Sequence, residues 1–132
     1  MQQMKNVIKV EDLLPAQIVG GTGEEGAAVD LRASETFDSV LVMAAVGAIT
    51  GTPSSVKVKI EECDVNTFDS GVTIAAGGEE FTVTADSLHV KEVVRSKRYI
   101  RAVVTIADGA APTANCHVGA VLNNWSVPYN RV

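Results

Sequence analysis

The segment 95–106 (RSKRYIRAVVTI) limits the choice of fold more than any other part of the sequence, because its side chains alternate between two chemical types. One phase is wholly apolar: Ile100, Ala102, Val104 and Ile106. The other phase carries a ring, a charge and a hydroxyl: Tyr99, Arg101, Val103 and Thr105. A period of two is that of a β-strand with one face in a core. The segment therefore predicts a strand whose second face can contact a partner.

The apolar residues favour strands throughout the chain. Hydrophobic residues make up 46% of the 132 residues and charged residues 20%, which fits one folded domain rather than a disordered chain. Val, Ala, Ile and Thr dominate, and aromatic residues reach only 5%. Because β-branched side chains pack well on pleated surfaces and lose rotamer freedom in helices, this composition predicts an all-β fold.

Further strands are predicted where apolar residues alternate or run together between turn signals. The clearest alternation, in 55–62, sets three apolar residues inward and three charged residues outward: Val56, Val58 and Ile60 against Lys57, Lys59 and Glu61. The apolar run 39–49 is long enough for a buried helix, but Gly47 and its valine and isoleucine content favour a central strand. The remaining predicted strands are 28–31, 72–75, 81–85, 87–94 and 115–122.

Roughly seven or eight short strands with frequent turn signals predict an antiparallel β-sandwich that is jelly-roll-like, with an immunoglobulin-like strand order left open. We expect the sandwich domain to span residues 27–122. Residues 1–26 are predicted as an extended N-terminal arm and a glycine-rich loop, since Pro15 makes a helix there unfavourable. Residues 123–132 are predicted as an extended C-terminal tail.

Charge is distributed unevenly along the chain. The formal net charge of −5 disfavours nucleic-acid binding, because such binding needs a positive surface that displaces counterions. Yet five of the 11 Lys and Arg residues lie within 91–101, whereas 14 of the 16 Asp and Glu residues come earlier. We predict four basic residues as partner contacts: Arg95, Lys97, Arg98 and Arg101. The alternative is a solvated strand edge that Lys and Arg protect from aggregation.

Both ends of the chain carry further candidate contacts. An extended N-terminal arm can add a strand to a neighbouring sheet, with Val7, Ile8 and Val10 filling pockets. The C-terminal tail contains Trp125 and Tyr129, which either fold back onto the body or anchor in a partner. These five residues complete the predicted partner-binding set.

The sequence carries no arrangement of side chains typical of catalysis or metal binding. His117 and the neighbouring Cys116 point to opposite faces of a strand, so they cannot act as a pair, and His89 is the only other histidine. CxxC and HxxxH spacings for zinc are missing, and the loop 64–71 lacks the distal glutamate of a calcium loop. We therefore predict no enzyme, no cofactor, no metal and no small-molecule substrate.

Cysteine usage and hydropathy indicate a compartment. Cys63 and Cys116 are too few for a disulfide scaffold, so we expect two free thiols and synthesis in a reducing host cytoplasm. No apolar run has the length of a signal peptide or of the roughly 20 residues of a membrane span, so we expect no contact with a membrane.

Three motifs resemble those of capsid decoration, or cement, proteins of tailed bacteriophages: AAVGAITGTP, VKVKIEECD, and RSKRYIRAVVTIADG followed by a strand ending in AVL. The resemblance covers residues 29–122. It implies a structural protein of the virion that binds the outer surface of an assembled capsid as a dimer or trimer and bridges neighbouring subunits. The implied partners are the major capsid protein and further copies of this chain. A ligand that prefers the assembled shell stabilises that shell by mass action.

Two other roles remain open on the sequence alone. One is a head-tail connector or tail structural subunit, which would form closed rings. The other is a carbohydrate-binding β-sandwich of the virion, for which exposed aromatic side chains are few.

Overall fold

The computed structural model describes residues 8–20, 23–31, 39–51, 55–106 and 113–123. The regular structure of these residues is entirely β, and none of their segments forms a helix that could cross a membrane. The strands are β1 (Ile8–Val19), β2 (Glu24–Glu25), β3 (Val29–Asp30), β4 (Ser39–Thr50), β5 (Ser55–Cys63), β6 (Thr73–Ile74), β7 (Phe81–Thr84), β8 (Ser87–Val94), β9 (Tyr99–Thr105) and β10 (Thr113–Asn123). The predicted all-β class is confirmed.

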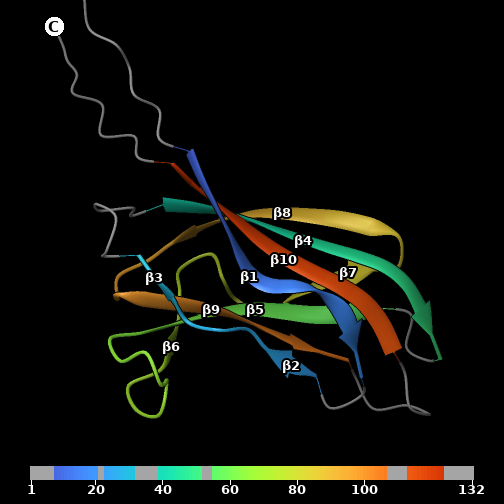
Figure 1. Cartoon of the computed structure of the whole chain (residues 1–132), viewed down its shortest axis with the longest axis horizontal. Coiled ribbons are helices and arrows are strands. Elements are labelled where there is room, and N and C mark those ends of the chain that lie inside the picture. Colours follow the sequence, from blue (N-terminus) through green and yellow to red (C-terminus); the bar gives the residue numbers. More distant parts are fainter. Residues whose placement is uncertain (1–7, 21–22, 32–38, 52–54, 107–112, 124–132) are drawn as a thin grey trace, which may run out of the picture.

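The strands form two antiparallel sheets that pack face to face (Figure 1). Sheet A has four strands in the order β1-β10-β4-β8. Sheet B has the order β2-β9-β5-β6, with β3 also paired to β9 and β7 also paired to β5. The molecule is therefore a two-layer sandwich, as the alternating strands predicted.

Each border of sheet B is built from two short strands. β2 and β3 pair with successive parts of β9, and β6 and β7 pair with successive parts of β5. Counting each such pair as one interrupted strand leaves eight positions in chain order, arranged as 1-8-3-6 in sheet A and 2-7-4-5 in sheet B. This is the double Greek-key order of a jelly roll, and it differs from the immunoglobulin-like order.

The hydrophobic core lies between the two sheets. Its main side chains come from the inward phases of β4, β5, β9 and β10: Val40, Val42, Ala44, Val46, Val56, Val58, Ile60, Ile100, Ala102, Val104, Cys116, Val118 and Ala120. Burial of one such valine or isoleucine contributes about 1.5–3 kcal/mol. The inward phases predicted for 55–62 and 95–106 are thus confirmed, as is a strand rather than a helix for the apolar run that begins at residue 39.

Residues 8–19 form a strand of sheet A instead of part of an extended arm. β1 pairs with β10 from Ile8 opposite Asn123 to Val19 opposite Ala114. Leu13 and Leu14 are both buried, and the register shifts on either side of Leu14 let two consecutive side chains enter the core. Burial of these leucines is the physical reason that the sandwich begins well before residue 27.

The end of β5 departs from the predicted alternation. Glu61, Glu62 and Cys63 are all buried, although Glu61 was expected on an outward, wet phase and Cys63 falls on the same phase. The loop after β5 covers them: Phe68 is 7% exposed, and the Cys63 thiol donates a hydrogen bond of 3.1 Å to the Ser70 carbonyl. Cys63 and Cys116 are both free thiols, as predicted.

Candidate functional site

Arg98 lies just before β9, where its guanidinium is bound by a carboxylate of the same chain. Its Nε and Nη2 donate to the two oxygens of Asp30, at 3.0 and 2.8 Å, in a bidentate pair. This hydrogen bonding raises the pKa of Arg98 above its ordinary value. The guanidinium also lies over the Tyr99 ring, 5.0 Å from its centroid. The side chain thus fixes β3 to the start of β9.

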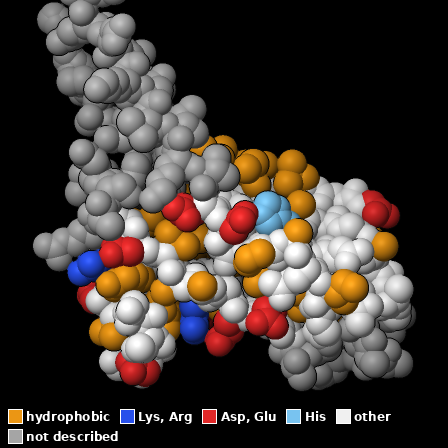
Figure 2. All heavy atoms as spheres, in the orientation of Figure 1, with side chains coloured by type: hydrophobic (Ala, Val, Ile, Leu, Met, Phe, Trp, Pro, Cys, Tyr) orange, Lys and Arg blue, Asp and Glu red, His pale blue; other side chains and the backbone are white. Residues whose placement is uncertain are grey.

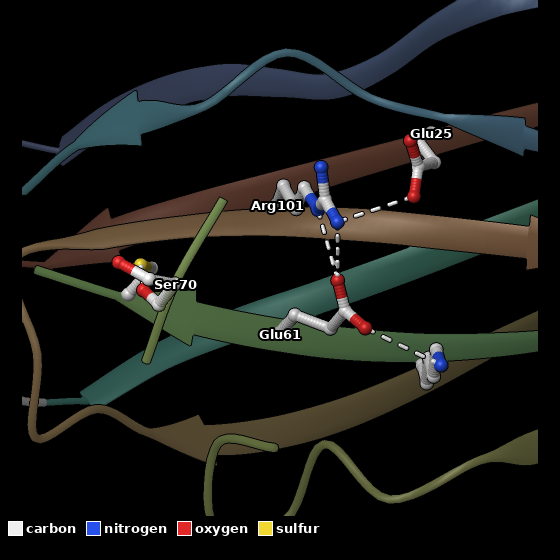
Figure 3. A network of polar contacts seen from close by, with 6 residues as sticks. Glu25, Glu61, Ser70 and Arg101 are labelled. Carbon is white, nitrogen blue, oxygen red and sulfur yellow. Dashed lines mark hydrogen bonds and ion pairs between the residues drawn. The ribbon is translucent and has the colours of Figure 1, made fainter. Parts of the chain in front are cut away.

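Arg101 lies in the middle of β9 between two carboxylates, as Figure 3 shows. Its Nη2 is 2.8 Å from Glu61 and 3.1 Å from Glu25, and its guanidinium lies 4.4 Å from the centroid of the Phe68 ring. Only 16% of the Arg101 side chain and 11% of the Glu61 side chain are exposed. Lys59 also contacts Glu61, at 3.3 Å. The network therefore covers the outer face of sheet B around Arg101 and leaves its charges paired.

The connection between β8 and β9 is held by the buried carboxylate of Glu62. That carboxylate accepts hydrogen bonds of 2.7 Å from both the N–H and the hydroxyl of Ser96, and one of 3.2 Å from the Lys97 N–H. Burial acts to raise the pKa of Glu62, but these hydrogen bonds and a further one from Thr73 outweigh it, so the pKa lies below its ordinary value of 4.5. Glu62 therefore holds the connection between β8 and β9 against the end of β5.

The predicted basic contact residues are thus engaged within the chain. Besides Arg98 and Arg101, the Lys97 ammonium donates to the Gly71 carbonyl, and Arg95 Nη1 donates to the Lys97 carbonyl at 3.1 Å. A partner carboxylate at this strand would have to compete with Asp30 or Glu61. Carboxylates of the same chain pair with Arg98 and Arg101, whereas Arg95 and Lys97 donate to main-chain carbonyls, so a contact of these four residues with a partner stays a prediction.

The surface that does remain open is the outer face of sheet A. Of the seven large hydrophobic residues that are strongly exposed in the described part of the chain, five lie on this sheet: Ile18, Leu41, Leu88, Val90 and Val94. Figure 2 shows hydrophobic side chains gathered over β4 and β8. A sandwich needs apolar residues only on its inner faces, so this outer surface calls for another explanation.

Strand register brings the apolar residues of the outer face together in rows. Met43 lies opposite Val90 on β8 and opposite Gly119 on β10. One row along, Leu41 lies opposite Val121. Side chains directly opposite each other in an antiparallel pair are in contact distance, so apolar side chains follow a diagonal from Val90 on β8 through β4 to Val121 on β10. Glu92, opposite Leu41 on β8, borders this diagonal. We call this diagonal, with Leu41, Met43, Leu88, Val90 and Val121, the apolar strip.

A shallow hollow of about 460 Å³ lies beside the apolar strip, over β1, β10 and β4. Its lining includes Ile18, Ala45, Gly47, Asn115 and His117. His117 Nε2 lies 2.8 Å from a carboxylate oxygen of Asp12 on β1, and both side chains are about half exposed. Small residues on β4 make the hollow, and the polar pair forms its rim. The hollow is therefore a shallow depression with both apolar and polar lining in the outer face of sheet A.

No group of three or more His, Cys, Asp or Glu side chains that could hold a metal ion occurs among the described residues. Burial raises the pKa of the Cys116 thiol, which disfavours the reactive thiolate. His89 stacks on Phe81 with 4.9 Å between ring centroids, on the side facing the core.

The other predicted contact residues are at the chain ends. Ile8 and Val10 belong to β1, where their main chains pair with Asn123 and Val121. Val7, Trp125 and Tyr129 lie outside the described residues.

Comparisons with known proteins assign no family. No protein-family model and no curated protein sequence matches the chain. Among solved structures, it is similar to the crystal structure of PirA, with 13% sequence identity over 94% of this chain and 99% of that chain, and a TM-score of 0.45. The comparisons therefore assign no function to the chain.

Proposed function

We propose that the protein is a structural component of a phage virion that binds the exterior of the assembled capsid and bridges neighbouring copies of the major capsid protein. The role is non-enzymatic and needs no cofactor. The motif resemblance supplies the capsid as partner, and the open apolar strip on sheet A supplies the means of contact. The apolar strip is the observation that carries the proposal.

The apolar strip suits docking because the outer face of sheet A exposes apolar side chains, whereas the outer face of sheet B carries paired charges and a covering loop. The outer side of sheet B carries the Arg101 network and the loop with Phe68, whose charges and ring are satisfied internally. The outer side of sheet A instead leaves Leu41 42% and Val90 48% exposed. Removing such side chains from water on a partner surface is favourable by roughly 25 cal/mol per Å² of apolar area.

A protein that bridges two capsid subunits stabilises the assembled shell even when each single contact is weak. One copy that touches two capsid subunits binds the assembled shell better than separated subunits, and this preference shifts the assembly equilibrium toward the shell. Many copies on one shell add their effects.

The test is co-sedimentation of the purified protein with expanded, undecorated capsids of its source phage. We expect saturable binding and a higher temperature of shell disruption. Leu41→Glu should weaken binding at least about tenfold, because it places a carboxylate in an apolar contact. Val65→Glu is the matched control, since Val65 is also 42% exposed but lies in the loop after β5, and it should bind like wild type.

Ionic strength separates this contact from a charge-driven one. Binding through the apolar strip should change little between about 0.1 and 1 M salt, whereas binding through Arg and Lys would weaken because ions screen exposed charges. Failure of the folded wild-type protein to bind shells would reject the capsid role and favour a connector or tail subunit. Equal binding by Leu41→Glu would reject the apolar strip as the contact.

A further inference from the structure

Three of the four sheet borders in the sandwich are interrupted, and β8 is not. β1 contains Pro15 and two register shifts, while the borders of sheet B consist of strands of two or four residues. Short strands, bulges and proline are the usual devices that stop a sheet border from pairing with another chain. β8 pairs with β4 over all eight of its residues without a shift and contains neither proline nor glycine. Figure 1 shows it at the margin of sheet A.

The hydrogen-bonding groups of β8 that face away from β4 can be identified from one contact. The Val94 N–H donates to the Ala76 carbonyl at 2.8 Å, on the side opposite β4. Main-chain groups in an antiparallel strand alternate between its two sides, so Val90 and Leu88 direct their N–H and C=O groups to that same side. Among the described residues, no loop bonds to the main chain of either. Gly77 packs against the Glu92 carbonyl and covers only that end of the strand.

The side chains at this open stretch are apolar. Leu88 is 60% and Val90 is 48% exposed, on the outer face. Lys91, the cation that could guard the border, instead lies over the Phe81 ring at 5.3 Å from its centroid. The stretch therefore offers both unpaired main-chain groups and apolar surface, which together bind an extended strand.

We propose that β8 pairs antiparallel with β8 of a second copy, joining two sandwiches through one continuous sheet. Pairing centred on His89 sets Leu88 against the partner's Val90 twice, both times on the outer face. These are the hydrogen-bonded positions, so about four main-chain bonds form without displacing Gly77. The strand is self-complementary in this register, which is why a second copy is the occupant. This dimer goes beyond the capsid contact and does not depend on it.

The register makes a distinctive electrostatic prediction. Asp86, in the turn before β8, would lie opposite the partner's Glu92, at both ends of the paired region. Like charges opposed in this way repel, and salt screens them. Dimerisation should therefore strengthen as salt rises, and Asp86→Asn should tighten it severalfold. Asn is suited to the site because residue 86 has a φ of 55°, in the left-handed region that Asn tolerates.

The decisive experiment combines sedimentation velocity over a range of concentrations with cysteine cross-linking of the full chain. Residues at the centre of the pair have Cα atoms about 4.5 Å apart, which a disulfide can span. Oxidised His89→Cys should thus form a covalent dimer, while Thr82→Cys, on exposed β7, should not. The native thiols do not interfere, because Cys63 and Cys116 are buried.

Substitutions on the two borders of sheet A complete the test. Leu88→Lys should raise the dimer dissociation constant at least about tenfold, and Ile18→Lys, at a site 70% exposed on β1, should leave it unchanged. Leu41→Glu should also dimerise normally, because Leu41 on β4 belongs to the proposed capsid contact alone, whereas Leu88 and Val90 belong to both surfaces. A wild-type protein that stays monomeric up to about 100 µM, a dimer indifferent to Leu88→Lys, or equal cross-linking of both cysteine variants would overturn the proposal.

Discussion

Arg101 and Glu61 lie directly opposite each other on β9 and β5, and Nε and Nη2 of the arginine both bond to one glutamate oxygen, at 2.9 and 2.8 Å. Removing the charge of Glu61 leaves a largely buried guanidinium whose one remaining counterion in the described part of the chain is the exposed Glu25. We expect Glu61→Gln to lower the free energy of unfolding by about 2 kcal/mol in urea titrations.

The matched control for this pair is Glu80→Gln. Glu80 and Lys57 form an ion pair at 3.8 Å in which both side chains are about half exposed. Such pairs contribute less than about 1 kcal/mol. Similar losses from the two substitutions would contradict the view that Arg101 and Glu61 hold the outer side of sheet B together.

Glu62 predicts a specific dependence of stability on pH. Because its pKa is lower in the folded protein than its ordinary value of 4.5, the carboxylate stabilises the fold fully above that value. The contribution is lost as the pH falls below about 4.5 and through the folded pKa. Urea unfolding of wild type and Glu62→Gln between pH 3 and about 7 should show the variant to be weaker at neutral pH and less sensitive to acid. Parallel pH profiles would exclude this role.

The two thiols should be inert while the protein is folded. Cys63 is fully buried and bonds to Ser70, and burial raises the pKa of Cys116. We expect a thiol reagent such as Ellman's reagent to titrate neither cysteine under native conditions and both after denaturation. Fast reaction of either thiol in the native protein would show that the end of β5 or the inward face of β10 opens readily.

Gly26 is required where the two sheets approach each other. Its N–H donates to the Ala102 carbonyl on β9, and a Cβ at this position would lie within 2 Å of the Leu13 carbonyl oxygen on β1. Gly26→Ala should lower the melting temperature by about 5 °C or more, because main-chain atoms must move to make room. Gly20→Ala meets no atom within 4 Å and should change the melting temperature little.

Strands with one buried face could be predicted from the sequence because the period of two is a local signal. The alternation in 55–62 identified Val56, Val58 and Ile60 as core residues, and all three are at most 1% exposed. It failed at Glu61, because the cover over that residue comes from Phe68 and Arg101, whose contacts depend on the tertiary fold.

β1 could not be recognised by the same signal. Leu13 and Leu14 are adjacent and both buried, which no regular strand period permits, and Pro15 follows them. The strand exists because β10, far along the chain, pairs with it. A long-range partner of this kind leaves no mark in a local pattern.

In the candidate site, too, the residue types could be read from the local sequence, but their long-range contacts could not. The basic residues were visible as charges, but Asp30 and Glu61, which neutralise Arg98 and Arg101, lie many residues away. The apolar strip did leave a signal: the run SVLVMAAVGAI is apolar on both phases, although the outer face of a two-layer sandwich is usually polar. Leu41 and Met43 are apolar residues on the outward phase of this run.

The pairing of β1 with β10 also fixes when sheet A can be completed during synthesis. β1 ends at Val19, and β10, which begins at Thr113, is its neighbour in the sheet. Among the described strands, none that is synthesised before β10 pairs with β1. A nascent chain therefore carries Leu13 and Leu14 uncovered until residues 113–123 have left the ribosome, a state in which chaperones recognise exposed apolar segments. Insertion of β10 between β1 and β4 is the closing step, and it follows translation of nearly everything else in the sandwich.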